Sequence, residues 1–179
     1  PCQAGTFSPS RNASACIPCH PGKVSRGAED SCTACPAGRF NNSKQDDCES
    51  CPAGRWSAAV AAASGDVCTA CSEGRYSREG GADSEDACVA CPAGKAHTRR
   101  VPGAFNSSFC VSCPRDTYQD KPGRTACKPC STTATSNGGA TICTECNAGD
   151  YMDARSRSCV ICPSGFTSTY GASQCESCG

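Results

Sequence analysis

Cysteine spacing constrains the fold of this chain more than any other feature of its sequence. The 179 residues include 21 cysteines, and all except the first belong to C-x-x-C pairs that recur every 16 to 22 residues. The pairs are Cys16/Cys19, Cys32/Cys35, Cys48/Cys51, Cys68/Cys71, Cys88/Cys91, Cys110/Cys113, Cys127/Cys130, Cys143/Cys146, Cys159/Cys162 and Cys175/Cys178. Cys2 heads a segment that matches the one after Cys51, so it is the second half of a further pair. A period of this kind predicts a tandem array of small repeats.

The array shows no linker and no break in composition, so we divide it into repeats and not into separate domains. About ten repeats follow one another over 1–18, 19–34, 35–50, 51–70, 71–90, 91–112, 113–129, 130–145, 146–161 and 162–177, and residues 178–179 begin the next one. We expect one continuous array that the parent polypeptide or assembly extends. Each repeat is expected to contact only its immediate neighbours, as in other repeat proteins.

Large apolar side chains are too scarce to form an ordinary core. The sequence has no leucine, three isoleucines, one methionine and one tryptophan. Ordering each backbone residue costs about 1–2 kcal/mol, which most proteins offset by burying such side chains. Here disulfides must supply the difference, since one that closes a loop of about 15 residues stabilises by roughly 3 kcal/mol. The predicted fold class is a small disulfide-rich repeat array: an elongated rod, mostly irregular, with short β pieces and no conventional hydrophobic core.

Each repeat begins with the pattern C-P-x-G-x-aromatic-S and continues through a polar loop to the next C-x-x-C pair. Proline presets φ and glycine accepts positive φ, so Pro-x-Gly predicts a tight turn. In two repeats the glycine is replaced, by Asp116 and Thr133. The aromatic position holds Phe7, Phe40, Trp56, Tyr76, Tyr118 and Tyr151 and is degenerate at Val24, Ala96, Thr135 and Thr167. Between the turns we expect only short extended segments.

The segment Cys48-Glu-Ser-Cys-Pro-Ala-Gly-Arg-Trp56 resembles ephrin-receptor-like cysteine-rich repeats, which are similar to the first module of tumour necrosis factor receptor repeats. The resemblance covers the whole chain. It implies that the second cysteine of each C-x-x-C pair bonds to the first cysteine of the next pair, with an aromatic ring packed beside the disulfide. Such repeats are stalks and spacers in many unrelated surface proteins, so the resemblance specifies fold more closely than function.

This pairing, the loop register, gives ten bonds. They are Cys2–Cys16, Cys19–Cys32, Cys35–Cys48, Cys51–Cys68, Cys71–Cys88, Cys91–Cys110, Cys113–Cys127, Cys130–Cys143, Cys146–Cys159 and Cys162–Cys175. Every loop then contains its own turn, and only Cys178 is left, with its partner expected outside the segment. The alternative register closes each C-x-x-C pair on itself, which constrains little of the chain and is typical of redox devices. Sequence alone leaves both registers open; we prefer the loop register.

Zinc is another use for paired cysteines, because C-x-x-C motifs about 12 residues apart resemble zinc ribbons. The lone Cys2 and the even spacing of the pairs favour crosslinks instead. His20 and His97 occupy unrelated positions in their repeats. Neither catalytic-triad order nor a phosphate-binding loop appears. We therefore expect no metal site, no cofactor, no catalytic residue and no enzymatic activity.

The charge and hydropathy of the sequence limit the kinds of molecule that this protein is expected to bind. The 17 basic and 17 acidic residues balance, which argues against nucleic acid as a partner, since phosphate binding needs a clustered positive excess. No apolar run approaches the 18 or so residues of a membrane span. Disulfides at this density persist in oxidising compartments, so we expect the protein outside the cell or at its surface, with an export signal that has been removed or lies outside this segment. The expected partners are other protein chains, copies of itself included, and covalent glycans.

Two surface patterns accompany the repeats. N-glycosylation sequons begin at Asn12, Asn41 and Asn106, each in the loop before a C-x-x-C pair, where a surface glycan would fit. Basic residues follow the turn glycines and acidic ones precede the next pair: Lys23, Arg39, Arg55, Arg75 and Lys95, with Asp30, Asp47, Asp66 and Asp86. This indicates a ladder of ion pairs, a stripe for an acidic glycan or, our preference, a solvated face, because exposed pairs contribute only about 0–1 kcal/mol.

Together these features predict an extracellular structural segment, such as a stalk, a matrix component or part of a filament or appendage. One disulfide per repeat would stiffen it. The alternative is the ligand-binding ectodomain of a cell-surface receptor, and a zinc-binding protein is a more remote alternative.

Overall fold

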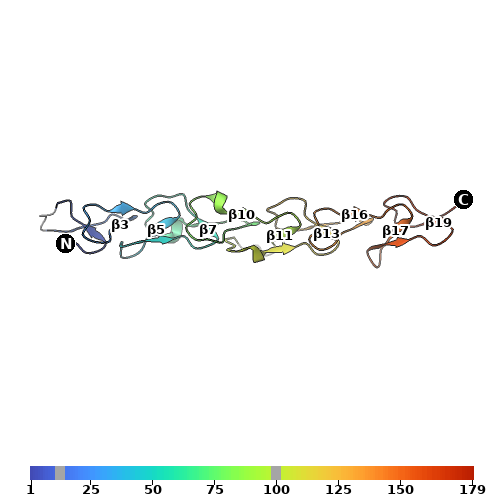
Figure 1. The fold of residues 1–179 in the computed structure, drawn as a ribbon, viewed down its shortest axis with the longest axis horizontal. Helices are drawn as coiled ribbons and strands as arrows, with labels where there is room; N and C mark the ends of the chain where they lie inside the picture. The colour runs from blue at the N-terminus through green and yellow to red at the C-terminus, as the bar shows by residue number, and fades with distance from the viewer. Residues whose placement is uncertain (11–14, 98–101) are drawn as a thin grey trace. The chain divides into compact units, whose positions relative to one another are not determined.

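The computed structural model describes residues 1–10, 15–97 and 102–179. The chain forms two compact units: unit 1 comprises Pro1–Val89 with Val101–Ser107, and unit 2 comprises Ala90–Arg100 with Ser108–Gly179 (Figure 1). The loop 102–107 therefore belongs to unit 1, although it lies between two segments of unit 2 in the sequence. The predicted repeat boundaries are not tested by this division and stay a prediction.

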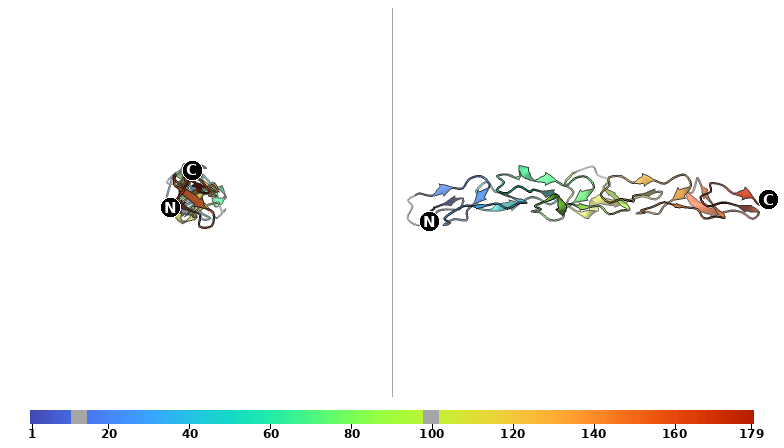
Figure 2. Two further views of the ribbon diagram at one scale, coloured as in Figure 1. Left: turned by 90° about the vertical axis from the view of Figure 1, so that its right-hand side faces the viewer. Right: turned by 90° about the horizontal axis from the view of Figure 1, so that it is seen from above.

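Each repeat contributes one short β-hairpin, and within each unit the hairpins follow one another in chain order (Figures 1 and 2). The paired strands are β1 (Thr6–Phe7) with β2 (Ile17–Pro18), β3 (Lys23–Val24) with β4 (Thr33–Ala34), β5 (Arg39–Asn41) with β6 (Cys48–Ser50), β7 (Arg55–Trp56) with β8 (Thr69–Ala70), β9 (Arg75–Tyr76) with β10 (Val89–Ala90), β11 (Lys95–His97) with β12 (Cys110–Ser112), β13 (Thr117–Tyr118) with β14 (Lys128–Pro129), β15 (Ala134–Thr135) with β16 (Thr144–Glu145), β17 (Asp150–Asp153) with β18 (Ser158–Ile161), and β19 (Phe166–Thr167) with β20 (Glu176–Ser177). The described residues contain no α-helix. The predicted class of disulfide-rich repeat array with short strands is confirmed.

The turn chemistry of the sequence explains where each hairpin starts. In the repeat 51–70, Arg55 N donates to Pro52 O at 3.0 Å and closes the turn, with Gly54 at φ +81°. Cys71 N donates to Gly54 O at 2.8 Å and fixes the other end of the hairpin. A residue with a side chain is disfavoured at such a φ, which accounts for the recurring glycine.

The three longest repeats place their extra residues in 3-10 turns immediately before a C-x-x-C pair. These turns are η1 (Gly65–Val67), η2 (Glu85–Ala87) and η3 (Ser107–Phe109). Gly65 lies under the ring of Phe40 from the preceding repeat, since a Cβ on Gly65 would be 3.1 Å from the Phe40 ring. The insertions thus provide a packing surface for a neighbouring repeat.

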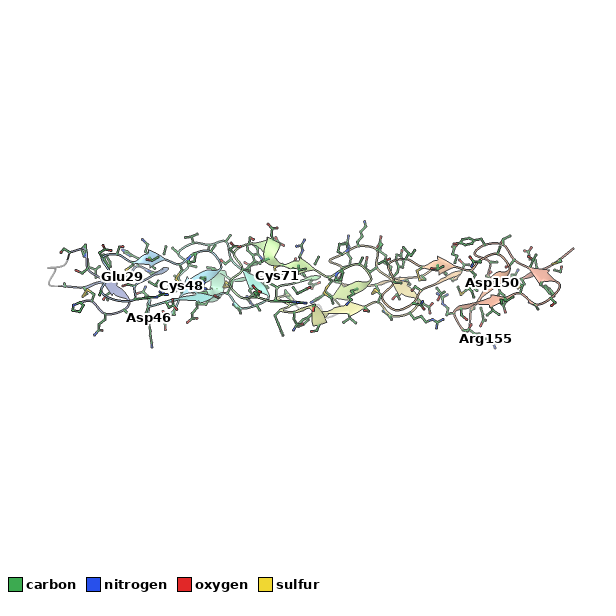
Figure 3. All side chains as sticks on the ribbon, viewed as in Figure 1. Glu29, Asp46, Cys48, Cys71, Asp150 and Arg155 are labelled. Carbon is green, nitrogen blue, oxygen red and sulfur yellow. A yellow bond between two sulfur atoms is a disulfide. The ribbon has the colours of Figure 1, made fainter. Side chains whose placement is uncertain are left out.

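One disulfide spans each hairpin (Figure 3). The bonds join the pairs of the loop register, namely Cys2–Cys16, Cys19–Cys32, Cys35–Cys48, Cys51–Cys68, Cys71–Cys88, Cys91–Cys110, Cys113–Cys127, Cys130–Cys143, Cys146–Cys159 and Cys162–Cys175. The Cα atoms of bonded cysteines are 5.4 to 5.8 Å apart, as a disulfide requires. Cys178 is exposed and has no disulfide partner among the described residues, and its pairing outside this segment stays a prediction.

Half-cystines and small residues form the interior. Cys35, Cys51, Cys71, Cys91 and Cys146 are fully buried, and the buried apolar side chains beside them are mostly alanines. Because these side chains are small, the chain backbones of neighbouring repeats approach one another closely. The interior is therefore made of crosslinks and main-chain contacts.

Candidate functional site at the contacts between repeats

The residue that follows the aromatic position is the most consistently buried polar position, and we call it the spine position. It is occupied by Ser8, Ser25, Asn41, Ser57, Ser77, His97, Gln119, Ser136, Met152 and Ser168, of which all but Ser8 are buried. Three of its serines bond to the preceding repeat: Ser25 Oγ donates to Thr6 O at 2.9 Å, Ser136 Oγ to Thr117 O at 2.8 Å and Ser168 Oγ to Asp150 O at 2.7 Å. The sequence analysis assigned no role to this position.

Main-chain hydrogen bonds join most repeats to the next, whereas repeats 130–145 and 146–161 are joined through side chains. Between repeats 51–70 and 71–90, Gly81 N donates to Cys51 O at 2.8 Å and Ser57 N donates to Ala82 O at 3.0 Å. Equivalent double bonds join Cys2 and Ser8 to Ala28 and Glu29, Cys35 and Asn41 to Ala61 and Ala62, Cys71 and Ser77 to Gly103 and Ala104, Cys91 and His97 to Gly123 and Arg124, Cys113 and Gln119 to Gly139 and Ala140, and Cys146 and Met152 to Gly171 and Ala172. The same pair of bonds therefore recurs at seven junctions of the described chain, while Ser25 N alone donates to Gln45 O between repeats 19–34 and 35–50.

The turn glycine also contacts the loop two repeats further along the chain. A Cβ on Gly54 would lie 2.7 Å from the carbonyl carbon of Gly103 and 2.9 Å from Ala104 O. Gly5, Gly22, Gly38 and Gly94 face Lys44, Ala61, Gly81 and Gly139 in the same way. The expectation that a repeat contacts only its immediate neighbours is wrong. Glycine is required at these turns because the left-handed φ and the second-neighbour backbone both exclude a side chain.

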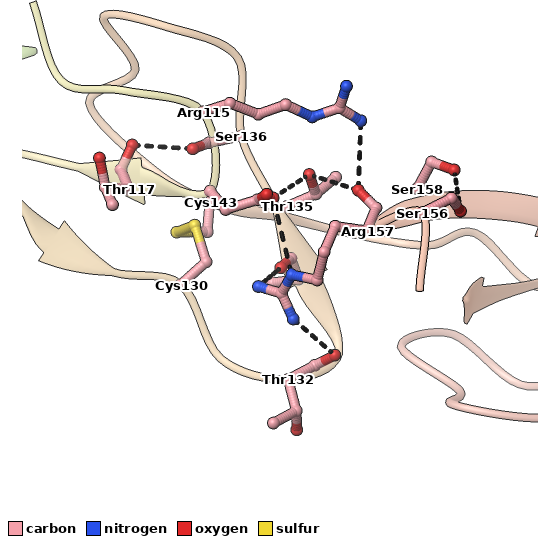
Figure 4. Close-up of polar contacts among 12 residues, drawn as sticks. Arg115, Thr117, Cys130, Thr132, Thr135, Ser136, Cys143, Ser156, Arg157 and Ser158 are labelled. Carbon is pink, nitrogen blue, oxygen red and sulfur yellow. Dashed lines mark hydrogen bonds and ion pairs between the residues drawn. A yellow bond between two sulfur atoms is a disulfide. The ribbon is translucent and has the colours of Figure 1, made fainter. Parts of the chain in front are cut away.

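Two turns in unit 2 lack glycine, at Asp116 and Thr133, and the one at Asp116 uses a polar network instead (Figure 4). Asp116 takes the glycine position with φ +63°. Thr135 Oγ1 donates to Asp116 Oδ1 at 2.6 Å and lies 3.1 Å from Arg157 O. Repeats 113–129, 130–145 and 146–161 are thereby joined through side chains.

Arg157 completes this network (Figure 4). Its guanidinium donates to Ser131 O, Thr132 O and Ala134 O at 3.2 to 3.3 Å, and its Nε lies 3.8 Å from Asp116 Oδ1. Arg157 thus donates hydrogen bonds to carbonyl groups around the turn of repeat 130–145, and its positive charge lies close to the Asp116 carboxylate.

We expect Arg157→Ala to loosen this part of unit 2, with the free energy of unfolding falling by about 1–3 kcal/mol, because carbonyls and a carboxylate lose a charged donor. Arg155→Ala is the matched control, since Arg155 is exposed on the same loop, and we expect a change within about 0.5 kcal/mol. Urea unfolding of both variants measures the difference. Equal effects would show that the network contributes nothing.

His97 occupies a spine position at which most repeats have serine. Its side chain is fully buried, and neither ring nitrogen has a hydrogen-bond partner among residues 1–10, 15–97 and 102–179. The ring stacks on Phe109, with centroids 5.6 Å apart and an interplanar angle of 15°. A buried polar group without a partner is destabilising by about 1–3 kcal/mol, whereas Met152 fills the same position in another repeat with an apolar side chain.

We therefore expect His97→Met to raise the free energy of unfolding by about 1 kcal/mol, because removing unpaired polar atoms outweighs the lost stacking on Phe109. The control is His20→Met, since His20 is exposed and its replacement changes stability by less than about 0.5 kcal/mol. Thermal unfolding compares the two. A lower melting temperature for His97→Met would contradict the argument.

The basic residues after the turn glycines do not form the ladder of ion pairs, the alternative to a solvated face, within the described part of the chain. Arg55 and Arg75 instead donate to the carbonyls of Cys68 and Cys88, at 2.8 and 2.9 Å. Of the acidic residues, Asp47 pairs with Arg26 at 3.3 Å. A backbone hydrogen bond from Cys48 and the Arg26 guanidinium lower the pKa of Asp47. Arg55 and Arg75 therefore stabilise their hairpins through hydrogen bonds to carbonyl groups and do not form ion pairs with carboxylates among the described residues.

The predicted glycosylation sites have different surroundings. Asn12 lies outside the described residues. Asn41 was expected on the surface, but this is wrong: it is 8% exposed at a spine position, where its Oδ1 accepts from Gly22 N at 2.9 Å and its Nδ2 donates to Asn42 O. A glycan on Asn41 would break that contact. Asn106 is half-buried, and its glycosylation stays a prediction.

The described surface of each unit includes a shallow groove. The groove of unit 1 has a volume of about 460 Å³ and is lined by Tyr76, Arg78 and Val89 among others. The groove of unit 2, of about 410 Å³, lies between Tyr118, Ile142, Glu145 and Tyr170. Aromatic side chains in the repeats are only half-buried, and Lys128 lies 5.5 Å from the ring centroid of Tyr118. These rings present apolar faces that a ligand could contact.

The described residues offer little for metal chemistry. No group of three or more His, Cys, Asp or Glu side chains is placed to hold a metal ion in residues 1–10, 15–97 and 102–179. Twenty cysteines are engaged in disulfides, so the zinc alternative lacks thiolates. Within the same ranges, no helix has the length and hydrophobicity to cross a bilayer.

Comparison with known proteins agrees with the geometry. The family model described as tyrosine-protein kinase ephrin type A/B receptor-like matches residues 22–68 and 104–146, just over half of the chain. The chain belongs to this ephrin-receptor-like family. No curated protein matches it. Ephrin-receptor-like cysteine-rich repeats with a disulfide in every hairpin indicate an extracellular domain, because such bonds persist in oxidising surroundings.

Proposed function

We propose that this ephrin-receptor-like array is a structural segment, a stalk, matrix or filament component, that holds other parts of an extracellular assembly apart. It catalyses no reaction and needs no cofactor. Its partners are other protein chains, including copies of itself, and its exposed loops carry glycans.

The contact of five turn glycines, Gly5, Gly22, Gly38, Gly54 and Gly94, with the second-next repeat is the observation that carries this proposal. Because Gly54 meets Gly103 across an intervening repeat, bending between two repeats also disturbs a third. Three-repeat contacts recur in each unit, for example at Gly38 with Gly81 and at Gly94 with Gly139. A ligand-binding module has no need of such periodic bracing, whereas a spacer depends on it.

Single-molecule stretching tests the proposal. Bonded cysteines are 13 to 19 positions apart in the sequence. While the disulfides are intact, the loops between them cannot extend, so the stretched chain should reach only a short contour length. After reduction, each loop should release about 45–65 Å, at about 3.5 Å per residue. A chain that already extends fully before reduction is no mechanical spacer.

A receptor ectodomain is the second candidate, and the unit 2 groove favours it. Tyr170 and Ile142 are 63% and 67% exposed beside that groove, and exposed apolar side chains gathered in one place often mark a binding surface. Replacing both with serine would abolish binding of a soluble ligand in the receptor case and leave the stretching behaviour unchanged in both cases.

A further inference from the structure

The loop of repeat 130–145 contains Asn137-Gly138-Gly139, where asparagine precedes glycine as at no other position in the sequence. Asn137 is exposed, and its side chain forms no hydrogen bond within the described residues. Its carbonyl accepts from Ala140 N at 3.3 Å, so the segment is a turn. The Gly138 N–H donates no hydrogen bond there either. A free side-chain amide therefore adjoins a free backbone N–H on an unhindered residue.

We propose that Asn137 is a site of spontaneous deamidation, and that its conversion loosens the contacts between three repeats of unit 2. The Gly138 nitrogen attacks Cγ of Asn137, a new N–Cγ bond forms, and the Cγ–nitrogen bond of the side-chain amide breaks. Ammonia leaves, carrying the proton from Gly138. Water then opens the five-membered imide at either carbonyl and yields aspartate or isoaspartate. Glycine at position 138 favours ring closure because it has no Cβ and adopts many conformations.

The consequence follows from what the loop contacts. Gly139 N donates to Cys113 O at 2.8 Å, and Gln119 N donates to Ala140 O at 3.1 Å. Gly139 also faces the turn glycine Gly94, where a Cβ would be 3.1 Å from its carbonyl carbon. Isoaspartate adds a methylene group to the backbone directly before Gly138. It therefore displaces Gly139 and Ala140 from their contacts with repeat 113–129, and Gly139 from its contact with repeat 91–112.

Other asparagines serve as internal references. Asn41 is buried with its amide bonded, and Asn42 Nδ2 donates to Asp46 Oδ1. Asn147 is exposed in an equivalent polar turn but precedes alanine. If exposure alone governed the reaction, Asn147 would react as fast as Asn137.

The test is incubation of the whole chain at physiological temperature and mildly alkaline pH. Peptide mapping then follows the mass change of amide to carboxyl at each asparagine, and isoaspartyl methyltransferase labelling detects isoaspartate. We expect conversion at Asn137 first. In Gly138→Ala it should slow on the order of fivefold. Alanine fits there, since the nearest atom to an added Cβ is Cys113 O at 3.6 Å.

Hydrogen exchange of the Gly139 and Gln119 amides supplies the second readout. Both amides should exchange faster in the isoaspartate form than in the unmodified chain, whereas Ser57 in unit 1 should not change. Asn137→Gln should stay unmodified and keep slow exchange. The proposal is overturned if Asn147 converts as fast as Asn137, or if isoaspartate forms and exchange at Gly139 and Gln119 is unchanged.

Discussion

Gly54→Ala is expected to lower the free energy of unfolding of unit 1 by about 2–5 kcal/mol. A left-handed φ costs a residue with a side chain roughly 1–2 kcal/mol, and Gly54 has φ +81°. Overpacking adds about 1–3 kcal/mol, because the new Cβ would be 2.7 Å from the carbonyl carbon of Gly103. Amide hydrogen exchange at Ser77 and Gly103 should therefore accelerate by a factor of about thirty or more.

Gly165→Ala separates the two contributions. Gly165 has nearly the same φ, +84°, but no atom lies within 4 Å of the Cβ position. It should therefore lose only the backbone term of roughly 1–2 kcal/mol. Equal losses in the two variants would show that the contact with the second-next repeat does not contribute to stability.

Removing one disulfide is expected to have an effect of similar size. The Cys51–Cys68 bond closes a loop of 17 residues and both cysteines are buried. Replacing both with alanine should cost about 3 kcal/mol through loop entropy, and trypsin should then cleave after Arg55 faster. Arg55 also donates a hydrogen bond to Cys68 O in the same hairpin. We expect this hydrogen bond to be lost once the disulfide is removed.

Thiol counting in this double variant also tests the register. In the loop register, removing Cys51 and Cys68 leaves every other bond intact, and Cys178 remains the one free thiol. If each C-x-x-C pair were closed on itself, Cys48 and Cys71 would lose their partners. Additional free thiols in the folded variant would then contradict the loop register.

The sequence predicts the hairpin of each repeat well, because local chemistry determines it. Pro-x-Gly requires a turn, and the cysteine spacing leaves few ways to close the loop that follows. The scarcity of large apolar residues correctly indicates an interior of half-cystines. These features depend on residues close together in the chain.

The contacts between repeats were harder to predict, because their partners lie about 20 to 50 residues apart. The signal was present in the recurring serine after the aromatic position. Aligning the repeats would have placed Asn41 in register with Ser25 and Ser57, and so in the interior instead of on a glycosylated surface. The close approach of Gly54 to Gly103 has no equivalent signal, since a turn glycine is explained already by its φ.

Peptide mapping without reduction tests the central claim most directly. The protein should be cleaved both between its C-x-x-C pairs and between the two cysteines of a pair, and the linked peptides identified by mass before and after reduction. We predict that Cys35 is found with Cys48, Cys51 with Cys68 and Cys71 with Cys88, with each linked pair gaining two hydrogen atoms on reduction. Peptides in which Cys48 is bonded to Cys51, or free cysteines other than Cys178 in the folded protein, would contradict the account.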